Sequence, residues 1–192
     1  MQIVLPGING SGELWLDIMK IICGDTSHKS MIDLGCHKAP YTPLLGFKER
    51  VYVDIQGRLL DDPNEQKYFI QDDVLGFLYY IKKRYDVAIA SDFIEHVSVE
   101  KGYEFLAIAR LQSKKQIIFT PLGEYMISDD DHPDSHRSGW TPEMLPIYLS
   151  IVLPDFHPIL GIGAFFAVNC SDEEKQRIIN EIKNKYVKDS GY

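Results

Sequence analysis

The chain has 192 residues, of which 45% are hydrophobic, and a formal net charge of -8. This length supports one substantial hydrophobic core and is short for two, so we expect a single domain over residues 1–192. The negative charge disfavours nucleic acid and anionic membrane surfaces as partners, because both would repel the chain.

The three cysteines are widely separated and lack the C-x-x-C spacing of zinc and redox sites. No apolar run is long enough to span a bilayer, and the N-terminus lacks the basic and apolar regions of a secretion signal. These features predict a cytoplasmic protein.

Helical and extended patterns alternate along the chain, which is typical of an α/β fold. Within a lead-in of residues 1–28, Ser11 and Gly24 are placed to begin and end a helix over 13–22. The strands predicted next are 30–34, 50–55, 67–73, 86–92 and 116–121. The helices predicted between them are 74–84 and 101–111.

The last third of the chain predicts two helices and a strand pair. Thr141 and Pro142 suit the first positions of a helix that extends to about residue 152. Two apolar segments within 156–170 are expected to form an antiparallel pair, and Ser171 begins the final helix.

Acidic residues lie at the ends of four predicted strands: Asp33, Asp54, Asp72 or Asp73, and Asp92. The carboxyl ends of parallel strands share one edge of a sheet, where ligands bind. Asp54 follows Asp33 by 21 residues, which places it to accept the hydroxyls of a ribose. One such aspartate could equally cap a helix, but four together favour a ligand site.

The segments MIDLGC, VYVDI, FIQDDV, DVAIASDFIEHV and QIIFTP, in this order and spacing, resemble the class I S-adenosylmethionine-dependent methyltransferases of the small-molecule type. The resemblance covers roughly residues 13–170. It implies a Rossmann-like sheet of seven mostly parallel strands, with an antiparallel last strand and helices on both faces. It also implies S-adenosyl-L-methionine as cofactor, S-adenosyl-L-homocysteine as product and a small-molecule acceptor.

The resemblance assigns cofactor-binding roles to residues at the strand ends. Those implied beside the methionine and ribose are Asp33, Gly35, Cys36 and His37. Those implied beside the ribose hydroxyls and the adenine are Asp54, Ile55, Asp73 and Val74, with Asp72 replacing Asp73 if the register shifts by one. Those implied at the methionine end are Ser91, Asp92 and Phe93.

The first turn departs from the family pattern, because His37 and Ala39 stand where later glycines are usual. We expect the turn still to bind, since this cofactor has no pyrophosphate that needs close backbone approach. The alternative is a non-catalytic methyltransferase-like module that no longer binds it. A dinucleotide site is disfavoured, because G-x-G-x-x-G would need glycines at His37 and Pro40.

His96 is the candidate general base, although a histidine that opens a helix can also be a simple hydrogen-bond partner. The polar stretch 122–140 is predicted to be a lid or acceptor loop. Within it Tyr125, His136 and Trp140 are candidate acceptor contacts, and Trp140 could instead anchor the core. A cluster in this stretch could suggest a divalent ion: Asp129, Asp130, Asp131, His132, Asp134 and His136. Adjacent acids on a loop cannot all face one ion, so the cluster is interpreted as a solvated charge run and no metal site is predicted.

Overall fold

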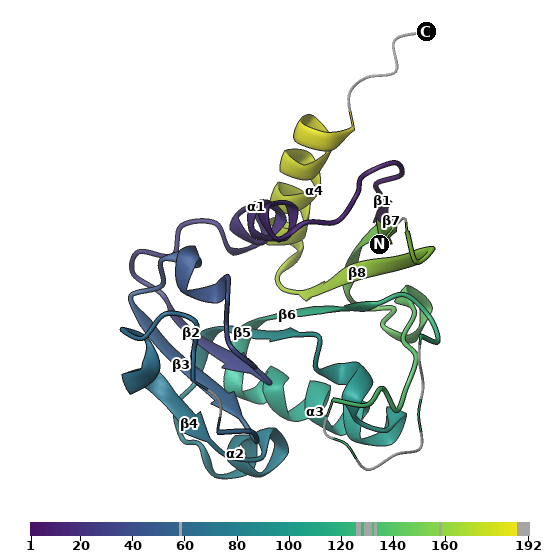
Figure 1. Cartoon of the computed structure of the whole chain (residues 1–192). Helices are drawn as coiled ribbons and strands as arrows, with labels where there is room; N and C mark the ends of the chain where they lie inside the picture. Colours follow the sequence, from purple (N-terminus) through teal and green to yellow (C-terminus); the bar gives the residue numbers. More distant parts are fainter. Residues whose placement is uncertain (58, 126–127, 129–131, 133, 158, 188–192) are drawn as a thin grey trace, which may run out of the picture.

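The computed structural model describes residues 1–57, 59–125, 128, 132, 134–157 and 159–187, which form one layered α/β unit (Figure 1). Its strands are β1 (Gln2–Val4), β2 (Ser30–Leu34), β3 (Glu49–Asp54), β4 (Phe69–Gln71), β5 (Tyr85–Ser91), β6 (Ser113–Pro121), β7 (Leu149–His157) and β8 (Ile162–Asn169). Its α-helices are α1 (Gly12–Cys23), α2 (Val74–Tyr80), α3 (Val99–Gln112) and α4 (Asp172–Tyr186).

The strands form one sheet in the order β1-β7-β8-β6-β5-β2-β3-β4. Every neighbouring pair is parallel except those of β8, which is antiparallel to both β6 and β7. The predicted mostly parallel sheet with an antiparallel last strand is therefore confirmed. The additional strand is β1, whose three residues pair with β7 and are too few to show a periodic pattern.

Helices cover both faces of the sheet, as predicted (Figure 1). Apolar residues of α1 and α4 join one buried cluster, and those of α2 and α3 join another on the opposite face. Successive residues of β2 contribute to different clusters, Met31 to the first and Ile32 to the second, because side chains alternate across a strand. The two helix layers therefore pack on opposite faces of the sheet.

The helix caps follow the sequence signals. The Ser11 hydroxyl accepts from Leu14 N at 3.1 Å, and Gly24 ends α1 with a φ of 64°. The Ser171 hydroxyl accepts from Glu174 N at 3.3 Å at the start of α4. Among the helices of the described residues, none is both long and apolar enough to cross a lipid bilayer.

The helix predicted from Thr141 to about residue 152 is wrong. Pro142–Met144 forms a single 3-10 turn without a side-chain cap from Thr141, and β7 begins at Leu149. The apolar, partly β-branched run after Leu149 lies between β1 and β8 and pairs with both. Tertiary strand pairing therefore outweighs the local helix-start signal.

Helix α2 is also shorter than predicted. It ends at Tyr80 because Ile81 takes an extended conformation, with φ -65° and ψ 132°. Of the basic residues beyond it, Lys83 pairs with Glu49, and Arg84 donates to Ser113 O at 3.2 Å. These cations connect neighbouring elements of the fold.

Candidate functional site

A cavity of about 920 Å³ opens at the carboxyl ends of β2, β3 and β5. This volume lies in the range that holds drug-sized ligands and cofactors. The predicted residues that line it are Asp33, Gly35, Cys36, His37, Asp54, Ile55, Asp73, Val74, Ser91, Asp92, Phe93 and His96. The fold thus brings together residues that are spread over 64 positions of the sequence, from Asp33 to His96.

The turn after β2 has left-handed backbone at the two positions where glycines were expected. His37 and Ala39 take left-handed conformations with φ of 48° and 47°. Gly35, with φ 72°, is needed as glycine, because a Cβ there would lie 2.4 Å from Cδ2 of Phe93. The non-glycine residues carry the backbone strain that glycine would avoid.

Asp54 fixes this turn through its carboxylate. Its Oδ2 accepts from His37 N at 2.8 Å, and its Oδ1 accepts from Gln56 N at 2.8 Å. Each carboxylate oxygen can accept a further hydrogen bond, so a fixed and buried acceptor faces the cavity.

Asp33 is buried behind Asp54. Its Oδ2 accepts from the Thr42 hydroxyl at 2.6 Å. Burial raises the pKa of the Asp33 carboxyl to about 7, and the negative charge of Asp54 acts in the same direction. Asp33 therefore exchanges its proton near neutral pH while Thr42 holds its side chain in place.

Of the two candidate acids after β4, Asp73 lines the cavity and Asp72 does not. Asp73 caps α2, with Oδ2 accepting from Gly76 N at 2.7 Å. The Asp72 carboxylate accepts from the Tyr80 hydroxyl. Asp73 therefore both caps α2 and lines the cavity.

Asp92 follows β5 with a φ of 51°, and its N–H donates to Phe119 O at 2.8 Å. It is open to solvent through the cavity but has protein on its other sides, and this desolvation raises the pKa of its carboxyl to about 6. Phe93 packs against Phe105 with ring centroids 5.0 Å apart. Burial also lowers the pKa of His96, which keeps this imidazole neutral at pH 7.

A smaller cavity of about 240 Å³ shares part of the wall of the larger one. Two of the candidate acceptor residues, Tyr125 and His136, line it together with Glu95. Trp140 lines neither cavity. It is 1% exposed and donates from Nε1 to Ile94 O at 3.2 Å, so its position is that of a core anchor.

The predicted loop 122–140 is described only in part. Its ends meet, since Gly123 N donates to Trp140 O at 2.7 Å. Of the acidic run, Asp129, Asp130 and Asp131 lie outside the described residues.

Several cavity residues are not among the predicted site residues, because they come from elements predicted for other reasons or from loops. These residues are Ser11, Trp15, Tyr41, Lys101, Asp134, Arg137, Phe156 and His157. Glu95 is not among the predicted site residues either, although a carboxylate directly after Phe93 and Ile94 is a signal of a buried polar group.

Several solved structures that resemble this fold are methyltransferases. An S-adenosylmethionine-dependent methyltransferase from Archaeoglobus fulgidus has a TM-score of 0.56 at 16% identity, over 83% of this chain and 95% of that chain. The 1,6-didemethyltoxoflavin-N1-methyltransferase of Burkholderia thailandensis has a TM-score of 0.60 at 15% identity, over 82% and 76%. The small RNA methyltransferase HEN1 has a TM-score of 0.58 at 16% identity, over 84% of this chain and 25% of that chain.

No protein-family model matches the chain, and no curated protein matches its sequence. At these identities the structural likeness shows the fold: the chain has the Rossmann-like fold of S-adenosylmethionine-dependent methyltransferases. The neighbours act on a small molecule in one case and on small RNA in another, so the fold does not define the acceptor.

Proposed function

We propose that the protein is a methyltransferase that uses S-adenosyl-L-methionine and acts on a small-molecule acceptor. The observation that carries this proposal is the cavity of about 920 Å³, where Asp33, Asp54, Asp73 and Asp92 meet at one edge of the sheet. Two structures with this fold contain S-adenosylhomocysteine, which supports the same cofactor here.

In this proposal the two ends of the cofactor bind at opposite sides of the cavity. Asp54 accepts the ribose hydroxyls with a carboxylate that His37 N and Gln56 N already orient. Ile55, which is 56% exposed, packs on the adenine, and Asp73 accepts from its amino group. Asp92 and Phe93 lie at the methionine end.

The chemistry requires alignment and the exclusion of water more than it requires a covalent intermediate. The bound cofactor supplies an activated methyl group on a positively charged sulfur, which the carboxylates of the cavity stabilise. The smaller cavity beside Asp92 is the proposed acceptor site, with Tyr125 and His136 in its wall. Neutral His96 is the candidate to take a proton from the acceptor.

Calorimetric titration with S-adenosylmethionine and S-adenosylhomocysteine tests the proposal. The wild type is expected to bind both at micromolar concentration. The Asp54→Ala variant should bind at least about tenfold more weakly, because it loses a charged acceptor worth about 1.5–3 kcal/mol. The matched control is Asp72→Ala, which removes a neighbouring acid outside the cavity and should leave affinity unchanged.

Absence of binding by the folded wild type would contradict the proposal and favour the non-catalytic module. Equal affinities of the wild type and Asp54→Ala would refute the ribose assignment alone.

A further inference from the structure

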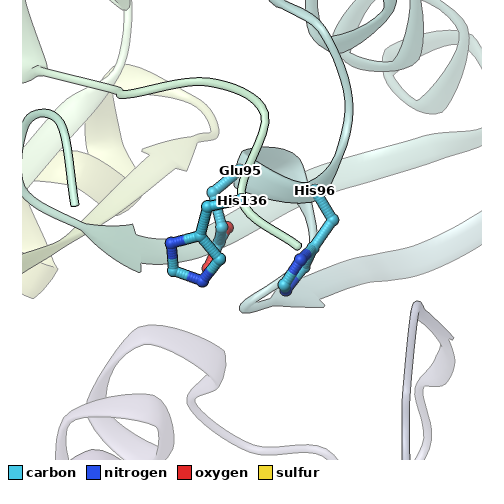
Figure 2. A group of neighbouring side chains, drawn as sticks. All are labelled: Glu95, His96 and His136. Atoms are coloured by element: carbon cyan, nitrogen blue, oxygen red, sulfur yellow. The ribbon is translucent and has the colours of Figure 1, made fainter. Parts of the chain in front are cut away.

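Three potential metal ligands, Glu95, His96 and His136, lie close together (Figure 2). His96 lines the larger cavity, and Glu95 and His136 line the smaller one. Glu95 and His96 belong to the 3-10 turn Ile94–His96 after β5, and His136 comes from the loop 40 residues further along the chain. One ligand atom from each of the three lies within 4.8 Å of the others. The two imidazole rings have their centroids 4.9 Å apart.

Glu95 lacks a hydrogen-bond partner on one side. It is 2% exposed, and its Oε2 accepts from the Thr120 hydroxyl at 2.9 Å. Its Oε1 is buried and has no hydrogen-bond partner among the described residues. A buried carboxylate oxygen without a partner is costly, so this atom indicates a missing ligand.

Both histidines are oriented by main-chain carbonyls. His96 Nδ1 lies 3.2 Å from Ser135 O, and His136 Nδ1 lies 2.8 Å from Tyr125 O. Because a carbonyl can only accept, each contact needs the hydrogen on Nδ1, which leaves a lone pair on Nε2. Histidines that bind metals are commonly held in this way by a partner on the other ring nitrogen.

A second acidic side chain, that of Asp92, lies beside the three residues. Asp92 lies close enough for its charge to act on both Glu95 and His136. It also belongs to the walls of both cavities. A cation at the junction would therefore compensate two neighbouring carboxylates.

We propose that Glu95, His96 and His136 bind one divalent first-row transition-metal ion, such as Mn²⁺, Co²⁺ or Zn²⁺. Two imidazoles among three ligands favour these ions over Mg²⁺ and Ca²⁺, which prefer oxygen. With bonds of about 2.0–2.2 Å, two ligands of one ion lie at most about 4.4 Å apart, so small side-chain rotations complete the site.

The ion has positions open to both cavities, because His96 lines the larger and Glu95 and His136 line the smaller. A polar group of a ligand in either cavity can therefore complete its coordination. The sequence predicted no metal, because the cluster of acidic and histidine residues from Asp129 to His136 was interpreted as a solvated charge run. This proposal reverses that prediction. The metal site does not depend on the proposed methyltransferase activity, but it excludes His96 as the base, because its Nδ1 carries the hydrogen and its Nε2 binds the ion.

The test is metal binding by the whole chain after treatment with a chelator. Titration with Mn²⁺, Co²⁺ and Zn²⁺, together with elemental analysis after dialysis, is expected to give one bound ion per chain. The visible absorption of bound Co²⁺ reports the coordination number and geometry of the ion, and its change in the His136→Ala variant tests whether this imidazole is a ligand. Glu95→Gln and His136→Ala should each weaken binding at least about tenfold.

The matched control is His157→Ala, which removes an imidazole that lines both cavities but lies outside the cluster. Its metal affinity should equal that of the wild type, and circular dichroism checks that each variant is folded. The proposal is overturned if the folded wild type binds none of the three ions saturably, or if His136→Ala binds them as tightly as the wild type. Titration with S-adenosylhomocysteine is scored separately, so failure of one proposal is distinguishable from failure of the other.

Discussion

The two ends of the site are built differently: one is the wall of the large cavity after β2 and β3, and the other is the region after β5 where the smaller cavity adjoins it. At the β2–β3 end, the N–H groups of His37 and Gln56 donate to both oxygens of Asp54, and the Thr42 hydroxyl donates to Asp33. At the β5 end, Glu95 keeps a buried oxygen without a partner among the described residues. Both oxygens of Asp54 thus accept hydrogen bonds, whereas Glu95 keeps one oxygen for the ion that we propose.

The two ends also differ in how the chain brings their residues together. The residues of the first end follow consecutive strands and meet because parallel strands end at one edge. The second end depends on a loop that is fastened to the turn after β5. Arg137 N donates to Glu95 O at 2.7 Å, and the Ser138 hydroxyl donates to Val97 O at 2.8 Å.

The largest expected effect is at the anchor of this loop. Trp140→Ala should lower the free energy of unfolding by about 3–5 kcal/mol, because it empties a core position and removes the bond to Ile94 O. Urea denaturation measures this change. Trp140→Phe keeps most of the ring and should cost less, about 1–2 kcal/mol from the lost N–H donor. A loss below about 1 kcal/mol in Trp140→Ala would show that the loop is held by other contacts.

The next largest effect is the loss of stability when Gly35 is replaced by alanine, compared with the same replacement at Gly123. Gly35 and Gly123 have φ of 72° and 76°, but only at Gly35 would a Cβ meet another atom, Cδ2 of Phe93 at 2.4 Å. Gly35→Ala should cost about 2–4 kcal/mol of stability through strain and overpacking together. Gly123→Ala should cost about 1 kcal/mol from strain alone. Equal losses in chemical denaturation would show that Phe93 moves aside.

The contribution of Asp33, the buried acid of the first end, to folding stability is expected to depend on pH. The pKa of Asp33 is raised to about 7 in the folded chain, so the folded state holds this proton more tightly than the unfolded state. Its contribution to stability is present below about pH 4 and is lost as pH rises towards 7. Asp33→Asn should therefore gain stability relative to the wild type between pH 5 and 8, on the order of 2 kcal/mol.

Melting temperatures of both proteins over this pH range measure the difference. A difference that stays constant with pH would contradict the raised pKa of Asp33.

The smallest effect is expected in the turn after β2, at His37, where a glycine is usual. His37→Gly should stabilise the protein by about 0.5 kcal/mol, because relief of left-handed strain slightly exceeds the added freedom of the unfolded chain. The bond to Asp54 comes from the main chain, so affinity for S-adenosylhomocysteine should be unchanged. A clear loss of affinity would instead give the His37 side chain a role in binding.

Much of the first end could be predicted from sequence, because its signals are local. Strand 30–34 was predicted with its observed bounds, since an apolar run that ends in Asp-Leu-Gly is read from neighbouring residues alone. The same holds for the caps at Ser11 and Ser171. The helix predicted from Thr141 failed because its residues pair with β1, which lies at the other end of the chain.

The sequence by itself determined the alternation of helices and strands and the acids at the strand ends. The tertiary structure decided which of these acids line the cavity, that Asp73 rather than Asp72 does so, and that Trp140 lies in the core. It also decided the meeting of His136 with Glu95 and His96. The physical reason is that periodicity and caps are set by neighbouring residues, whereas this meeting depends on hydrogen bonds between segments about 40 residues apart.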